Sequence, residues 1–119
     1  MITYDNLIKT TKEKIPLFAI RYDDMLHKDI IDKEAGNHIV FNYVFTPILI
    51  DLIENKEEEE IKKFFSFVEE MASSEDIRVT EVCDQSILEL LYDEFGDDIE
   101  EYFGEKTKEG FNAIKEYMN

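Results

Sequence analysis

Apolar residues recur at helical spacing through most of this chain, and this pattern limits the fold more than any other feature. Over 57–72 they stand at i, i+3, i+4, i+7 and i+10, which puts them on one face of an α-helix. The same spacing runs from Ile15 to Leu26. The residues of the 57–72 stripe are Ile61, Phe64, Phe65, Val68 and Met71. The spacing predicts an all-α protein.

Turn and capping residues divide the pattern into segments. Pro16 suits the first turn of a helix, Ser74 to Asp76 can cap one, and Gly96 can end one. We expect helices at about 3–14, 16–26, 47–54, 57–72, 77–95, 97–103 and 107–118, with Thr3 and Thr46 as caps. Such helices must bury one face against their neighbours, so we predict a compact array of about six or seven short helices. HEAT-like antiparallel helix pairs are compatible with this array, although no sequence period indicates repetition.

The segment 39–45 is ambiguous. Its density of β-branched and aromatic residues is typical of a strand, but a buried helix has the same periodicity. Thr46 and Pro47 resemble an N-cap and a first helical position, so a helix at 47–54 that extends back to 39 and a short hairpin at 38–46 both remain open.

Length and composition favour one helical domain over residues 1–119. A chain of 119 residues with 44% hydrophobic residues can form one core, and six Gly and Pro are too few for a sandwich or barrel. No apolar run reaches the roughly 20 residues that span a bilayer. The start of the chain has no basic and apolar signal segment. A single cysteine, Cys83, excludes an internal disulfide framework and fits a reducing compartment, so the expected location is cytoplasmic.

The net charge of −16 restricts the partners. Twenty-nine acidic residues stand against thirteen basic ones. A field of this sign repels nucleic acid and anionic membrane and attracts basic protein surfaces. We therefore expect a basic protein partner, with no nucleic acid and no membrane. Acidity that serves solubility alone is the simpler alternative.

The acidic residues are unevenly placed. Ten carboxylates stand in the stretch from Val79 through Glu105, and no Lys or Arg lies between Arg78 and Lys106. An ordinary solvent-facing helix would alternate Lys with Glu, as 59–63 does. Carboxylates without basic neighbours repel one another, which indicates a partner that supplies the positive charge. The predicted partner-binding residues are Asp84, Glu89, Asp93, Glu94, Asp97, Asp98, Glu100 and Glu101.

Residues with catalytic or metal-binding chemistry are few. His27 and His38 stand eleven apart in a loop-rich region without a third ligand at defined spacing. Cys83 lies on the apolar side of its helix, where a free cysteine acts as a small hydrophobe. The acidic clusters around Gly96 and Gly104 do not match a calcium loop. We predict no catalytic residues, no metal, no cofactor and no enzymatic activity.

Phe67 departs from the main apolar stripe of its helix. Packing against a second layer of the core explains it, and the alternative is an exposed anchor for a partner.

Two segments carry a family resemblance. Residues 45–54, Phe-Thr-Pro-Ile-Leu-Ile-Asp-Leu-Ile-Glu, resemble a recurring segment of a family of small helical bacterial proteins. So do 65–71, Phe-Ser-Phe-Val-Glu-Glu-Met, and the positions that follow, within about 38–95. Such proteins resemble, in size and acidity, the immunity proteins of polymorphic and contact-dependent toxin systems. The resemblance implies a cognate toxin held inactive in a tight 1:1 complex in the bacterial cytoplasm, and it carries over no catalytic residues.

Charge and resemblance together predict an immunity protein. The expected toxin is a basic nuclease, because a nucleic-acid groove is lined with Lys and Arg that carboxylates can occupy. The alternatives are a HEAT-like adaptor or regulatory protein-interaction module and a nucleic-acid mimic that inhibits a host DNA-binding protein.

Overall fold

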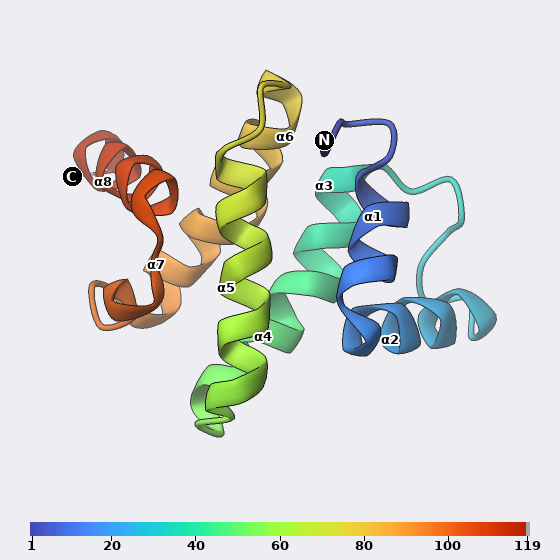
Figure 1. Cartoon of the computed structure of the whole chain (residues 1–119). Helices are drawn as coiled ribbons and strands as arrows, with labels where there is room; N and C mark the ends of the chain where they lie inside the picture. The colour runs from blue at the N-terminus through green and yellow to red at the C-terminus, as the bar shows by residue number, and fades with distance from the viewer. Residues whose placement is uncertain (119) are drawn as a thin grey trace.

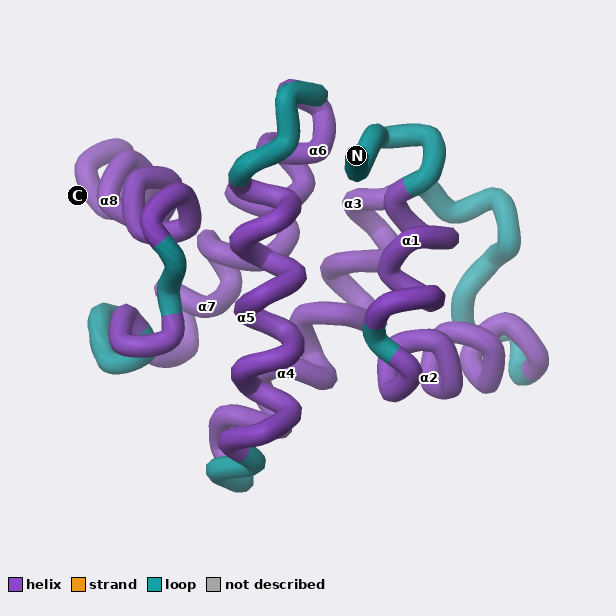
Figure 2. Tube along the Cα trace, viewed as in Figure 1, coloured by secondary structure: helices purple, strands orange, loops and turns teal. Residues whose placement is uncertain are grey.

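The computed structural model describes residues 1–118, and the α-helices of this range form six continuous segments (Figures 1 and 2). There is no strand among these residues, so the all-α prediction and the expected helix number are confirmed. The elements are α1 (Leu7–Lys14), α2 (Pro16–His27), α3 (Asn37–Val40) with the π-helix η1 (Phe41–Phe45) and α4 (Thr46–Glu54), α5 (Glu58–Ala72), α6 (Ile77–Cys83) with the π-helix η2 (Asp84–Leu88) and α7 (Glu89–Phe95), the 3-10 turn η3 (Glu100–Tyr102), and α8 (Glu105–Met118).

The helix α5 lies in the middle of the molecule, with α1 to α3 on one side and α7 and α8 on the other (Figure 1). It contacts α4, α6 and α8. Because α5 has neighbours on several sides, residues outside its main stripe are buried too. Phe67 is only 2% exposed, which confirms its predicted packing in the core and excludes the alternative of an exposed anchor.

A row of aromatic rings joins α2 to the central helix α5. Phe18 of α2 lies 6.1 Å from Phe41 and Phe45 between ring centroids, and Phe45 lies 4.9 Å from Phe64 of α5. These four side chains are fully buried. Since burying one such side chain stabilises a fold by roughly 1.5–3 kcal/mol, this row of rings holds α2, η1 and α5 together.

The ambiguous segment 38–46 is helical, which excludes the hairpin. This confirms the alternative in which the helix extends back to 39. Pro47 stands in the first turn of α4, but α4 continues from α3 and η1, so the proline lies inside the helical segment from Asn37 to Glu54. A proline in a helix loses one hydrogen bond, and its ring crowds the carbonyl of residue i−4. The preceding turn is a π-helix, in which the Thr46 N–H bonds to the Phe41 carbonyl. This wider turn accommodates Pro47.

Side-chain hydrogen bonds join the helical segment 37–54 to the π-helix η2. The Thr46 hydroxyl of α4, fully buried, donates to the backbone carbonyl of Ser86 at 2.6 Å. The Nδ1 atom of His38 in α3 lies 3.0 Å from the Ser86 hydroxyl. Thr46 therefore connects the helical segments 37–54 and 77–95. The sequence suggested that Thr46 caps a helix, and this prediction was wrong.

One predicted helix start and one predicted helix were wrong. The first helix begins at Leu7, because Thr3 donates its backbone N–H to the Asn6 side chain at 2.8 Å and belongs to a turn. The predicted helix at 97–103 is reduced to the 3-10 turn η3, and the last helix begins at Glu105. Asp76 does cap α6, since its carboxylate accepts the Arg78 N–H at 3.1 Å.

None of the helices within residues 1–118 is both long enough and apolar enough to cross a bilayer.

Candidate protein-binding surface

The helix α8 (Glu105–Met118) borders the acidic stretch, and Glu69 of α5 fixes its start. The Glu69 carboxylate accepts the backbone N–H of Lys106 at 3.0 Å and that of Thr107 at 2.9 Å, together with the Thr107 hydroxyl at 2.8 Å. Burial alone would raise the pKa of Glu69, but these hydrogen bonds together outweigh it and hold the pKa below its ordinary value. A carboxylate from another helix thus caps α8.

Gly104 makes this cap possible. A Cβ atom at Gly104 would stand 2.5 Å from the Glu69 carboxyl carbon and 2.5 Å from its Oε1 atom. Any other residue would push the carboxylate away from the first turn of α8. Gly104 therefore permits a close approach between chain segments.

Aromatic contacts fix the segment between α7 and α8. The Phe111 ring of α8 lies 4.8 Å from Phe103 and 5.5 Å from Tyr92, in edge-to-face arrangements. Tyr102 stacks on Phe65 at 5.4 Å, and its hydroxyl donates to the Glu58 carboxylate at 2.9 Å. Burial, followed by this hydrogen bond, raises the pKa of Tyr102 to about 12. The acidic turn at 97–101 is thereby held against α5 and α8.

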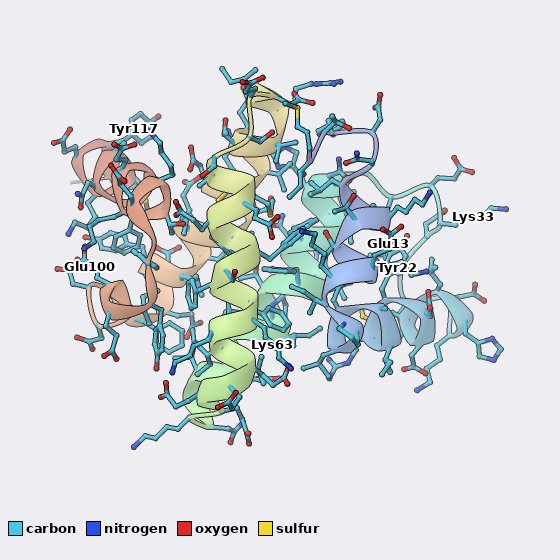
Figure 3. All side chains as sticks on the ribbon, in the orientation of Figure 1. Glu13, Tyr22, Lys33, Lys63, Glu100 and Tyr117 are labelled. Atoms are coloured by element: carbon cyan, nitrogen blue, oxygen red, sulfur yellow. The ribbon has the colours of Figure 1, made fainter. Side chains whose placement is uncertain are left out.

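The structure gives two of the predicted binding residues an internal partner. Lys115 Nζ lies 2.8 Å from Asp97 Oδ1 and 3.5 Å from Glu100 Oε1 (Glu100 is labelled in Figure 3). The expectation that the whole acidic stretch lacks basic neighbours was therefore wrong for Asp97 and Glu100. Their cation comes from a helix that the sequence places beyond the stretch.

Asp84 and Glu89 lie in a different setting. They line a hollow of about 500 Å³ together with Ala113, Ile114 and Tyr117 of α8. Tyr117 is 90% exposed, and Asp84 is partly buried. A Cβ atom on Gly110 would come within 3.0 Å of Asp84 Oδ1, so this glycine lets α8 pass close to the carboxylate.

The environment of Asp84 opposes its charge. Burial, followed by the negative charges of Glu89 and Glu81, raises the pKa of Asp84 above its ordinary value. No ion pair or hydrogen bond to the Asp84 carboxylate occurs within residues 1–118. The protein keeps a partly desolvated carboxylate beside an apolar wall. An incoming Lys or Arg would pair with the carboxylate and lay its aliphatic stem on that wall.

The helix α8 divides the acidic residues into two groups. Ala113 and Tyr117 line the hollow with Asp84, whereas Lys115 binds Asp97. At about 100° per residue, Lys115 points about 200° away from Ala113, to the opposite side of the helix. The eight predicted residues are thus not gathered on one uniform face.

Six of the eight predicted residues lie at the end of α7 and in the turn that follows it. Two of these six, Asp97 and Glu100, pair with Lys115. The other four, Asp93, Glu94, Asp98 and Glu101, are exposed. These four, together with Asp84 and Glu89, form no ion pair in the described part of the chain. We call Asp84, Glu89, Asp93, Glu94, Asp98 and Glu101 the free acidic set.

The sequence missed three residues that shape this surface: Glu69, Lys115 and Tyr117. Glu69 and Lys115 act on residues 37 and 18 positions away, respectively, so no local spacing indicates their roles. Tyr117 had a signal, since it stands beside the apolar face of the last helix and would be exposed there.

The residues considered for chemistry lie elsewhere. Cys83 is fully buried, as predicted, and burial raises the pKa of its thiol. His27 is exposed at the end of α2. His38 lies in α3, so its predicted position in a loop was wrong. Across residues 1–118, no three His, Cys, Asp or Glu side chains are grouped closely enough to hold a metal ion.

The fold and this surface define a small acidic protein made only of helices. Residues 8–119 match the family described as a domain of unknown function (DUF7674), and the chain belongs to this family. No curated protein matches the sequence. No solved structure matches it either.

Proposed function

We propose that this protein is an immunity protein that neutralises a cognate bacterial toxin in the cytoplasm. The toxin would be a basic protein, in particular a nuclease, bound in a tight 1:1 complex that blocks its active site. The observation that carries the proposal is Asp84, a partly buried carboxylate without an internal cation beside an apolar wall. Proteins keep such unfavourable groups where binding requires them.

The free acidic set supports the basic character of the partner. Carboxylates spread over the end of α7 would attract a Lys- and Arg-lined groove from a distance and accelerate association. Asp84 and Glu89, next to Tyr117, would make the close contacts. Tyrosine suits this place because it offers a large apolar ring and a hydroxyl at small entropic cost.

The direct test uses the gene next to the one that encodes this protein. If that gene encodes a secreted protein with a basic C-terminal domain, coexpression should protect cells from that domain. The two proteins should then elute as a 1:1 complex in size-exclusion chromatography with light scattering. Loss of growth despite full expression of this protein would contradict the proposal.

Asp84→Asn should have opposite effects on stability and on binding. In the free protein it removes a disfavoured charge and should raise the melting temperature at pH 7. Only the ionised Asp84 carboxylate lowers the stability of the folded protein. This loss of stability is therefore present above the raised folded-state pKa and absent below the unfolded-state pKa of about 3.9. The gain should therefore vanish at pH 3. In the complex, loss of a desolvated charge pair typically costs about 2–5 kcal/mol and appears as faster dissociation.

Glu94→Lys should mainly slow association, because Glu94 is exposed. The control is Glu13→Lys, since both residues are exposed and each is second to last in its helix. Glu13 also lies on the α1 side, across the molecule from Glu100 and the acidic turn (Figure 3). At low salt the association rate should fall several-fold for Glu94→Lys but not for Glu13→Lys. The difference between the two rates should become smaller at about 0.15 M salt, because salt screens exposed charges. Equal rates for both variants would mean that the acidity serves solubility.

An adaptor that joins two proteins is the second candidate. The surface around α8 and an apolar hollow between α2 and α3 lie on different sides of the molecule (Figure 1). An adaptor would hold two partners at once through these surfaces. Mass measurement of the complex separates the two functions, since an immunity protein would give one partner for each chain.

A further inference from the structure

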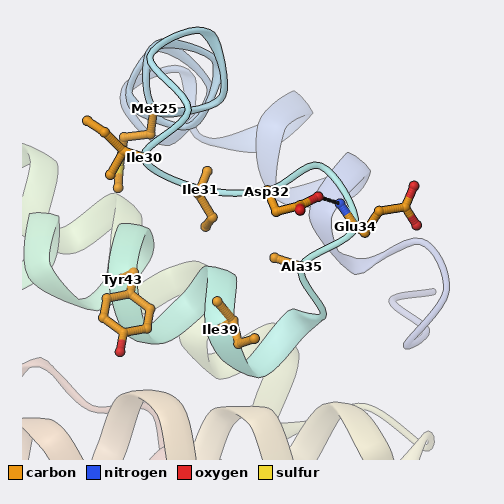
Figure 4. A pocket seen from close by; sticks show the side chains of 8 residues that line it. All are labelled: Met25, Ile30, Ile31, Asp32, Glu34, Ala35, Ile39 and Tyr43. Carbon is orange, nitrogen blue, oxygen red and sulfur yellow. Dashed lines mark hydrogen bonds between the residues drawn. The ribbon is translucent and has the colours of Figure 1, made fainter.

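The hollow on the α2–α3 side has a volume of about 380 Å³ and is mostly apolar. Met25 and Ile30, at the end of α2 and in the loop after it, form one wall. Ile39 of α3 and Tyr43 of η1 form the opposite wall (Figure 4). Its size is within the range of natural ligand pockets and exceeds the space that one apolar side chain needs.

Exposed apolar side chains are concentrated around this hollow. Ile30 is 63% exposed, Ile39 47% and Tyr43 65%. Single exposed apolar residues are common on protein surfaces, but several around one cavity mark a binding site.

The loop that lines the hollow is fixed by its own hydrogen bonds. The Ile30 N–H donates to the Met25 carbonyl at 2.9 Å, and the Ala35 N–H donates to the Asp32 carbonyl at 3.0 Å. The Glu34 N–H donates to the Asp32 carboxylate at 2.7 Å (dashed in Figure 4). Because the walls are already ordered, an incoming group loses little free energy to loop ordering.

The charge at the rim selects the occupant. Asp32 and Glu34 are the charged residues of the lining, and the Glu34 carboxylate extends outward from the rim (Figure 4). Lys33, between them in sequence, points into solvent (Figure 3). We propose that this hollow is an anchor site for one bulky apolar side chain carried by a Lys- or Arg-rich segment of a protein partner. This site goes beyond the proposed function, which concerns the surface around α8.

The test is an NMR titration of the full-length ¹⁵N-labelled protein with short synthetic peptides. The probe has one central leucine flanked by lysines and alanines, and its relatives carry serine for leucine or alanine for the lysines. The leucine–lysine peptide should shift the amide signals of Ile39 and Tyr43 in a saturable manner. Either relative should bind about tenfold more weakly, because it lacks the apolar anchor or the cations.

Variants locate the site. Ile39→Lys should weaken the leucine–lysine peptide at least tenfold, whereas Ile77→Lys should not, since Ile77 is 70% exposed but lies outside the hollow. Shifts confined to the α7–α8 surface and independent of leucine would overturn the anchor site and leave the proposed function standing. Equal binding of the lysine-free peptide would overturn the charge requirement. Self-association in sedimentation equilibrium, abolished by Ile39→Lys, would assign the hollow to a second copy of this chain.

Discussion

Thr46→Val is expected to lower the free energy of unfolding by about 0.5–1.5 kcal/mol, because it removes the buried hydrogen bond between the Thr46 hydroxyl and the Ser86 carbonyl. The Thr46 hydroxyl is fully buried and donates to that carbonyl at 2.6 Å. Valine has nearly the same shape, so the loss reports the hydrogen bond and not a cavity. Urea unfolding, with the midpoint and slope fitted together, measures the change.

The control for this prediction is Thr80→Val. The Thr80 hydroxyl also donates to a backbone carbonyl, that of Ile77 at 2.9 Å, but in an exposed setting. Water can replace that donor, so the change should stay within about 0.5 kcal/mol. If the two variants had the same free energy of unfolding, the hydrogen bond between Thr46 of α4 and Ser86 of η2 would contribute nothing, and our account of Thr46 would fail.

Glu69→Ala is expected to destabilise the protein by about 0.5–2 kcal/mol, since it removes the cap of α8. Three hydrogen bonds from Lys106 and Thr107 are lost. The control is Glu70→Ala, which changes the net charge equally but breaks only the exposed ion pair with Lys14. Such a pair contributes about 0–1 kcal/mol. Thermal unfolding of both variants at pH 7 measures the difference.

The effect of Glu69 should depend on pH in a defined direction. Its pKa is lowered in the folded protein, so its contribution is present above the unfolded value of about 4.3 and is lost as pH falls through the folded pKa. The difference in free energy of unfolding between the wild type and Glu69→Ala should therefore be constant near neutral pH and should become smaller in acid. A larger difference in acid would contradict the assignment of Glu69 as the cap of α8.

Gly104→Ala offers an independent check of the same contact. The added Cβ displaces the Glu69 carboxylate, so this substitution and Glu69→Ala remove the same interaction. In a double-mutant cycle their effects should be markedly less than additive. Additive effects would mean that Gly104 has another role.

Much of the fold was predictable because it depends on local spacing. The apolar stripe of α5, from Ile61 to Met71, faces the core of the protein. Gly96 ends α7 with a φ of 60°. The Asp76 cap and the buried thiol of Cys83 also follow from local patterns. These features arise within one or two turns of chain, where 3.6 residues per turn determines which side chains share a face.

The sequence did not predict contacts between distant segments. Thr46 and Pro47 resemble the start of a helix, and only the neighbouring π-helix shows why the chain continues through them. For Thr46 and Pro47, tertiary packing outweighs the local preference. Phe67 differs, because its burial against a second layer of the core was the favoured prediction and is confirmed.

By itself, the sequence determined an all-helical chain, its apolar faces and its excess of negative charge, because these depend only on spacing and composition. The tertiary structure decided which carboxylates are free. Lys115, 18 residues after Asp97, neutralises Asp97 and Glu100, while Asp84 lies beside Tyr117 and pairs with no cation within residues 1–118. The reason is physical: charges interact through space over a few ångströms, and only the packing of α8 brings these groups within that range.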